Sequence, residues 1–251
     1  MEIGLQFVNL NYAGHLGDSS YLAGMGFAIT ANNVLCQSIL NGLSYGMNTL
    51  ASQAFGAGNY KLYASYCHRA FFIILVAAAL LLPLFLFIGR ILLFIGIDPQ
   101  VAQLVGIYSK IAYPGFIFFA EGRLMRRFYQ SQRLVVAQFM PDVIALPLHI
   151  GLCELYTGYF DLGFQGIALA LNTTYIIKAG IFCLFLLRCC KYVQKRDTIQ
   201  PFSLDDFKRW GEYLRVAIPA VGNSIGMNEP RLARLFTRDG IFLAFFQSVS
   251  F

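Results

Sequence analysis

Charge is scarce in this sequence, since only 13% of its 251 residues are Asp, Glu, Lys or Arg. Soluble domains carry about 25%, so the shortage argues against a soluble globular protein. The hydrophobic fraction is 57%, and Phe alone occurs 24 times. A soluble chain of this length cannot bury that much apolar surface. The composition therefore predicts an integral membrane protein embedded in a lipid bilayer.

Signatures of catalysis and of metal binding are also lacking. The sequence has no HExxH pattern and no paired-cysteine metal motif, so we expect no enzyme, no catalytic residue, no cofactor and no metal. Its six cysteines fall within the predicted spans or near helix ends, and they form no disulfide framework. Its basic residues are not interleaved with aromatic ones, which argues against nucleic acid as a partner.

Runs without charge mark the membrane spans, because a helix needs about twenty apolar residues to cross the hydrocarbon. The chain is uncharged over 22–55 and 70–89, and Lys178 alone interrupts 163–187. The first thirteen residues are too short to cross, and we interpret them as the second half of a helix. A signal peptide is the alternative, but the basic start is missing and Glu2 has the opposite sign. The six predicted spans are 1–13 (partial), 22–50, 70–89, 107–124, 134–156 and 163–187.

Basic residues alternate between the two sides of these spans. The turns at 14–21 and 155–166 contain no Lys or Arg, whereas the turns near 56–69 and 123–133 are rich in them. Because basic residues stay in the cytoplasm, the pattern predicts that 56–60 and 126–132 are cytoplasmic. It also predicts a cytoplasmic start and end of the six-span unit, and it accounts for much of the net charge of +6.

The chain divides into three predicted regions. Residues 1–188 form a lobe of six helices. Residues 189–215 form a cytoplasmic linker whose amphipathic helix lies on the membrane surface, with Phe207, Trp210 and Leu214 on one face. Residues 216–251 form an incomplete seventh helix and a divergent tail, because the stretch after Pro219 does not have the composition of a span.

Several short motifs follow one another in order between the predicted spans. They are Gly14-His15-Leu16-Gly17, Gln53-Ala54-Phe55-Gly56-Ala57-Gly58-Asn59-Tyr60, Arg126-Arg127-Phe128-Tyr129-Gln130-Ser131-Gln132, Leu148-His149-Ile150 and Gly163-Phe164-Gln165-Gly166. Each motif alone is weak, but the ordered series resembles the multidrug and toxic compound extrusion (MATE) transporters in their eukaryotic branch.

The resemblance implies an all-α fold of twelve helices in two six-helix lobes, of which this chain carries the N-terminal lobe with a truncated first helix. It implies an antiporter, coupled to H+ or Na+, that exports organic cations and other xenobiotics across the plasma or vacuolar membrane. The likeness ends after Pro219. We therefore expect an incomplete product that does not transport by itself unless two lobes dimerise.

Two other classes remain as alternatives. One is a lipid or oligosaccharide flippase, against which the motifs at 53–57 and 126–127 argue. The other is a membrane protein that does not transport and acts only as a binding or assembly partner.

Ionisable residues within the spans are the candidate site residues, because burying one in hydrocarbon costs about 2.5–3.5 kcal/mol on insertion scales. Asp142 and His149 lie seven residues apart, so two helical turns place them on one face. We expect both to face the interior of the lobe, where they either serve an ion or substrate pathway or link helices. Gln37 and Asn41 offer uncharged partners four residues apart. Glu121 is expected in an ion pair with the nearby arginines, and Lys178 has no assigned role.

Overall fold

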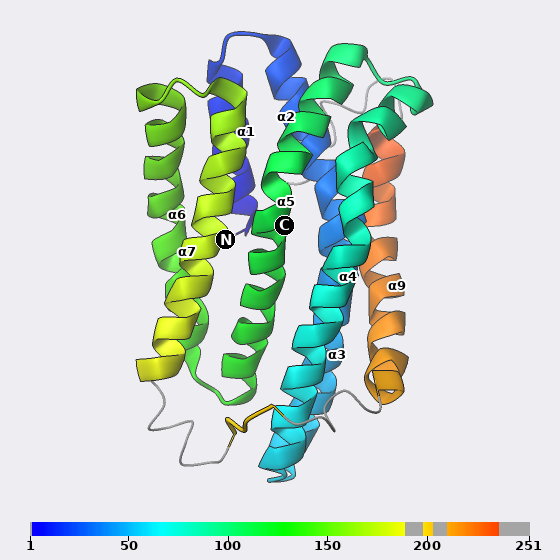
Figure 1. The fold of residues 1–251 in the computed structure, drawn as a ribbon, viewed down its shortest axis with the longest axis vertical. Helices are drawn as coiled ribbons and strands as arrows, with labels where there is room; N and C mark the ends of the chain where they lie inside the picture. The colour runs from blue at the N-terminus through cyan, green and yellow to red at the C-terminus, as the bar shows by residue number, and fades with distance from the viewer. Residues whose placement is uncertain (1, 189–197, 203–209, 236–251) are drawn as a thin grey trace.

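The chain forms an elongated bundle of helices in the computed structural model, which describes residues 2–188, 198–202 and 210–235. All regular structure in these ranges is helical (Figure 1). The elements are α1 (Glu2–His15), α2 (Ser19–Asn32), the π-helix η1 (Asn33–Gln37), α3 (Ser38–Gly56), α4 (Tyr60–Ile95), α5 (Pro99–Ser131), α6 (Val135–Glu154), the π-helix η2 (Leu155–Tyr159), α7 (Gly163–Arg188) and α9 (Trp210–Leu235).

Local sequence fixes where several of these helices begin and end. The Asp98 carboxylate accepts hydrogen bonds from the backbone N–H groups of Gln100 and Val101, at 2.9 and 3.2 Å, and so caps the first turn of α5. Asn59 caps α4 in the same way through Leu62. Gly96 ends α4 with φ of 92°, a conformation that glycine adopts without the steric cost of a side chain.

Within the described ranges, four helices are long and apolar enough to cross a membrane: α4, α5, α6 with η2, and α7. The predicted span 22–50 corresponds to α2, η1 and α3, which follow one another without a loop from Ser19 to Gly56. A π-helix inserts an extra residue into a helical turn and is often found at functional sites. Here η1 marks the middle of that long helical segment.

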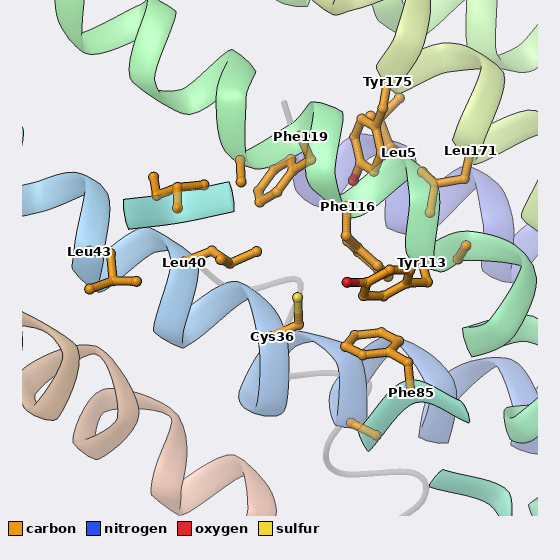
Figure 2. Packing of buried hydrophobic residues seen from close by; sticks show 14 of the residues in the cluster. Leu5, Cys36, Leu40, Leu43, Phe85, Tyr113, Phe116, Phe119, Leu171 and Tyr175 are labelled. Carbon is orange, nitrogen blue, oxygen red and sulfur yellow. The ribbon is translucent and has the colours of Figure 1, made fainter. Parts of the chain in front are cut away.

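Helix α5 runs through the centre of the bundle (Figure 1), where α2, α3, α4, α6 and α7 pack against it. Its aromatic side chains form much of the core (Figure 2). The ring of Phe85 from α4 lies 5.1 Å from Tyr113, and Phe119 lies 5.2 Å from Tyr175 of α7. These offset ring contacts join α4, α5 and α7 through buried side chains. Large apolar residues such as Leu80, Phe94 and Leu184 point outward, as the hydrocarbon of a bilayer requires.

The described part of the C-terminal region is more continuous than the sequence suggests. The first part of the expected linker helix, 203–209, lies outside the described residues. From Trp210 onward the structure has one continuous helix to Leu235, whereas the sequence predicts a linker helix within 189–215 and, separately, an incomplete seventh helix within 216–251. The reason is packing against α3. Gly42 and Gly46 lack side chains, so Val221 and Ala217 of α9 approach the α3 backbone closely.

Candidate functional site

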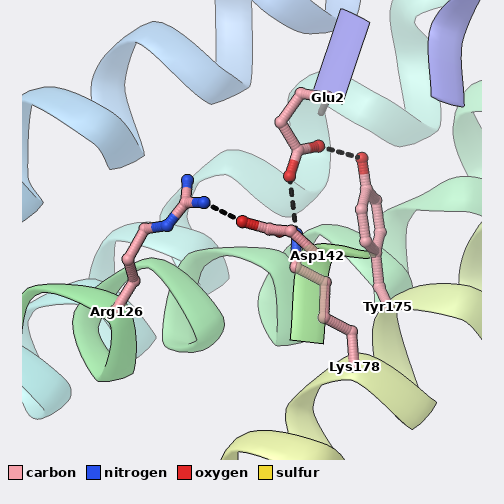
Figure 3. A network of polar contacts seen from close by, with 5 residues as sticks. All are labelled: Glu2, Arg126, Asp142, Tyr175 and Lys178. Carbon is pink, nitrogen blue, oxygen red and sulfur yellow. Dashed lines mark hydrogen bonds and ion pairs between the residues drawn. The ribbon is translucent and has the colours of Figure 1, made fainter. Parts of the chain in front are cut away.

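A cluster of charged side chains lies inside the bundle between α1, α5, α6 and α7 (Figure 3). The ammonium of Lys178 lies 2.7 Å from a carboxylate oxygen of Glu2 and 2.7 Å from one of Asp142. Asp142 also pairs with the guanidinium of Arg126. The hydroxyl of Tyr175 donates to the other oxygen of Glu2 at 3.1 Å. Four helices are thus connected by one chain of alternating charges.

Burial explains why these charges pair. The side chain of Asp142 is 1% exposed and that of Lys178 is 10% exposed. An isolated charge at this depth is costly, and each of the two acids is opposed by a basic group. Lys178, which had no assigned role in the sequence, is the central cation of this cluster, because it contacts both carboxylates.

A second cluster is neutral and lies further along the same helices. His149 on α6 is fully buried. One ring nitrogen lies 2.8 Å from the hydroxyl of Thr174 on α7, and the other lies 2.8 Å from the carboxamide oxygen of Asn9 on α1. The Asn9 amide in turn donates to the hydroxyl of Tyr108 at 3.2 Å. The Thr174 hydroxyl also lies within reach of the Ala170 carbonyl, at 2.7 Å.

The arrangement around His149 suits two protonation states. A neutral imidazole donates through one nitrogen and accepts through the other, whereas a protonated ring donates through both. The Asn9 oxygen accepts in either state. The Thr174 hydroxyl donates to the ring when it is neutral, and turns to the Ala170 carbonyl when the ring is protonated. This site can therefore hold or release a proton without a partner being lost.

Asp142 and His149 are 2% and 0% exposed, which confirms the expectation that both face the interior of the lobe. They belong to separate clusters, however, and no hydrogen bond or ion pair between them is present in the described residues. The sequence placed both on one helical face but gave no sign of Glu2, Asn9 and Thr174, which come from other helices.

The other two candidates of the predicted pathway lie at and beside the π-helix. Gln37 is the last residue of η1 and is 8% exposed. Asn41 follows one turn later in α3, and its buried carboxamide oxygen has no hydrogen-bond partner within the described part of the chain. Asn33 of η1 exchanges hydrogen bonds with Gln6 of α1. The widened turn is therefore a polar contact between α1 and the α2–α3 segment.

The expectation for Glu121 is wrong. Its two carboxylate oxygens are buried and make no hydrogen bond or ion pair with any described residue. The neighbouring arginines are directed elsewhere: Arg126 pairs with Asp142, and Arg127 donates to the hydroxyl of Ser44 at 3.2 Å. Successive helical positions point to different faces, so closeness in sequence did not bring these groups together.

The motif turns at 53–60 and 126–132 lie at the same end of the bundle. The hydroxyl of Tyr63 on α4 contacts Ser131 at 2.8 Å and accepts from the amide of Gln132 at 3.3 Å. Phe55 packs on the same tyrosine ring, with 5.5 Å between the ring centres. Gly58 has φ of 72°, a left-handed conformation that favours glycine. Gln53 and Gly56 are exposed beside it. The two motifs therefore form one structural unit.

Neither a serine nucleophile motif nor a metal-binding group finds support in the described geometry. Gly42, Ser44 and Gly46 match the letters of a GxSxG nucleophile motif, but that motif works at a sharp strand-to-helix turn, and here it lies inside α3. Among the residues that the structure describes, no group of three or more His, Cys, Asp or Glu side chains is suited to a metal ion.

Comparison with known proteins identifies the family. The MatE family model matches residues 1–155. The chain belongs to the MatE family. Protein DETOXIFICATION 13 of Arabidopsis thaliana is 31% identical over 219 residues, and Protein DETOXIFICATION 9 of the same plant is 29% identical over 216 residues. Each alignment covers 86% of this chain and 44% of the relative. The chain thus spans somewhat less than half the length of the curated relatives that it matches.

Solved structures agree with this assignment to the MatE family. The crystal structure of the eukaryotic MATE transporter AtDTX14 superposes with a TM-score of 0.86 at 26% identity, covering 98% of this chain and 55% of that one. An inward-facing multidrug resistance MATE family transporter superposes at 0.76 with 14% identity, covering 98% and 56%. The second likeness concerns the fold alone. This chain is therefore an integral membrane protein with the fold of one MATE lobe, the N-terminal one.

Proposed function

We propose that this chain forms one lobe of a secondary active transporter that exports organic cations and other xenobiotics in exchange for H+ or Na+. Membership of the MatE family supports the class of activity, and one solved structure with this fold is a multidrug resistance transporter. The observation that carries the proposal is the buried polar interior, where two clusters on the same helices hold Asp142 and His149. Such groups within a membrane segment mark ion or substrate pathways.

Of the two coupling ions, the geometry around His149 favours the proton. The ring is enclosed by Asn9 and Thr174, which satisfy it in either protonation state. Asp142 would belong to the same polar interior, and Gln37 of η1 and Asn41 of α3 would line the substrate path.

A single lobe supplies one wall of a central cavity, so transport needs a second wall. In the proposed mechanism this wall comes from a second lobe or from a second copy of this chain. The lobe lies in the plasma or vacuolar membrane, with 56–60 and 126–132 on the cytoplasmic side. By itself the chain is expected to insert but not to pump, because one wall cannot seal the two sides of a membrane in turn.

Ethidium efflux tests the proposal at two levels. Cells that express this chain alone should show no proton-driven efflux above the empty vector, and cross-linking in the same membranes would detect a dimer of lobes. Proton-driven efflux in membranes where cross-linking detects no dimer would contradict the statement that one lobe cannot transport.

A chimera provides the second level. The lobe replaces the matching half of Protein DETOXIFICATION 14, which is 30% identical over 216 residues. This chimera should transport, and Asp142→Asn and His149→Gln should each reduce its efflux at unchanged expression. Arg90→Gln, on the exposed face of α4, is the matched control. Unchanged efflux in both site variants would assign Asp142 and His149 a structural role only.

A further inference from the structure

A basic cavity opens between α5 and α6 near the end of the bundle that carries the motif turns. Its volume is about 210 Å³, and no acidic side chain is among the described residues that line it. The lining residues are Arg123, Arg126, Arg127, Gln130, Gln138 and Phe139. Three guanidiniums and two carboxamides supply many N–H donors to one small space, which is the donor set that suits an anion.

Aromatic rings hold the three guanidiniums in place. The guanidinium carbon of Arg123 lies 4.9 Å from the ring centre of Phe119, that of Arg126 lies 5.6 Å from Phe139, and that of Arg127 lies 4.1 Å from Tyr45. A cation over a ring face is attracted to it. The arginines are therefore oriented before any ligand arrives, which reduces the entropy that binding must overcome.

The charges around the cavity do not balance. Glu2 and Asp142 are matched by Lys178 and Arg126 in the buried cluster. Arg123 and Arg127 have no carboxylate partner in the described part of the chain. The Nε atoms of Arg123 and Arg126 are buried and lack a hydrogen-bond acceptor there. Among the described residues, the guanidiniums of Arg123 and Arg127 thus line a confined space without a carboxylate partner, and an anion would satisfy them.

The position of the cavity bears on the kind of anion. Arg127 lies four residues from the end of α5 at Ser131, which is about 6 Å along the helix axis. On the adjacent start of α6, Phe139, Met140 and Val143 are exposed, as expected of a surface that meets lipid. Basic pockets between transmembrane helices at this depth on the cytoplasmic side bind lipid head groups.

We infer that this cavity is an anion site that takes a phosphate group. The planar fork of arginine matches phosphate oxygens in pairs, and such charge-assisted hydrogen bonds are among the strongest in proteins. The phosphate belongs either to the head group of an anionic phospholipid or to a soluble organic ester. The inference goes beyond the proposed transport function, because two unpaired arginines repel an organic cation. It can therefore stand or fall independently of that function.

Binding of phosphatidylglycerol carrying a fluorescent acyl chain to the full chain in neutral detergent tests the inference. Arg123→Gln with Arg127→Gln should weaken binding by about tenfold or more, since charge-assisted hydrogen bonds are lost. Arg90→Gln with Lys110→Gln removes the same charge from exposed positions near the other end of the bundle and should leave affinity unchanged. Equal melting temperatures without lipid would establish that the variants fold.

A second variant and a competitor sharpen the result. Gln138→Trp fills the cavity without changing any charge and should also abolish binding. Glycerol phosphate distinguishes the sources: full competition identifies a site for the phosphate of either source, whereas binding of lipid that glycerol phosphate does not displace identifies a head-group site. The inference is overturned if the wild-type chain binds neither probe, or if both cavity variants bind as well as the wild type.

Discussion

The two sides of the bundle are held together by different means. On one side, α1, α6 and α7 are joined by buried ion pairs and hydrogen bonds around Asp142 and His149. On the other, α3 and α9 are joined by close backbone contact at Gly42 and Gly46. In lipid the hydrophobic effect does not drive helices together, so polar contacts and the packing of small residues are the two means that remain.

The two sides therefore differ in which substitutions they tolerate. A polar contact tolerates small movements but requires its partner, because an unpaired buried charge is costly. The close contact between α3 and α9 at Gly42 and Gly46, called the α3–α9 seam below, requires no chemical partner but tolerates no added atom. We therefore expect the polar side to respond to loss of charge and the α3–α9 side to respond to added volume.

Removing the central cation should have the largest effect. Lys178→Met leaves Glu2 and Asp142 without their shared partner, and breaking a buried pair in this way costs about 3–5 kcal/mol. Reversible unfolding in mixed micelles measures the free energy of unfolding. Lys110→Met, at an exposed position of α5, is the control and should change it little. If Lys178→Met lowers the free energy of unfolding no more than Lys110→Met does, water solvates the cluster.

Adding one methyl group to the α3–α9 seam should have the next largest effect. A Cβ at Gly42 would overlap the backbone of Val221, so Gly42→Ala should destabilise the bundle by about 1–3 kcal/mol through overpacking. Gly26→Ala, whose Cβ meets nothing within 4 Å, should be neutral or slightly stabilising. The same unfolding assay compares the two, and equal stability would mean that α9 moves away from α3 at little cost.

A single hydrogen bond on the seam side should have the smallest effect. The buried hydroxyl of Tyr213 on α9 donates to the carbonyl of Leu43 at 2.7 Å. Tyr213→Phe removes this bond without adding volume and should cost about 0.5–1.5 kcal/mol. Tyr159→Phe, at a residue that is 80% exposed, controls for the loss of a hydroxyl. A larger loss would place polar contacts among the main determinants of this seam as well.

Much of the helical organisation follows from composition along the chain. The uncharged stretch at 70–89 lies within α4, and the stretch at 163–187 corresponds to α7, because apolar runs of this length have few other stable forms in lipid. The interior position of Asp142 and His149 followed from their cost in hydrocarbon. The sequence predicts an amphipathic helix before 215 and an incomplete seventh helix after it, but not that Trp210–Leu235 is one helix, because its partner is a distant glycine seam on α3.

The partners within the candidate site were not predictable in the same way. Glu2 and Lys178 are 176 residues apart, and nothing in the local pattern of either indicates the other. Glu121 was assigned to arginines close to it in sequence, yet the structure leaves its carboxylate without a partner among the described residues. The spacing of residues along one helix determines only which face of that helix each residue occupies. Which residue it pairs with depends on how each helix is rotated against its neighbours.

The sequence by itself determined that the chain enters a membrane, where most of its spans lie, and which family it resembles, since these depend on local hydrophobicity and ordered motifs. Only the tertiary structure decided that Lys178 joins Glu2 to Asp142, that Asn9 and Thr174 enclose His149, and that Arg123 and Arg127 share a cavity. The physical reason is that the membrane selects helices by their summed hydrophobicity, whereas pairing between buried polar groups is set by distances of about 3 Å that only helix packing fixes.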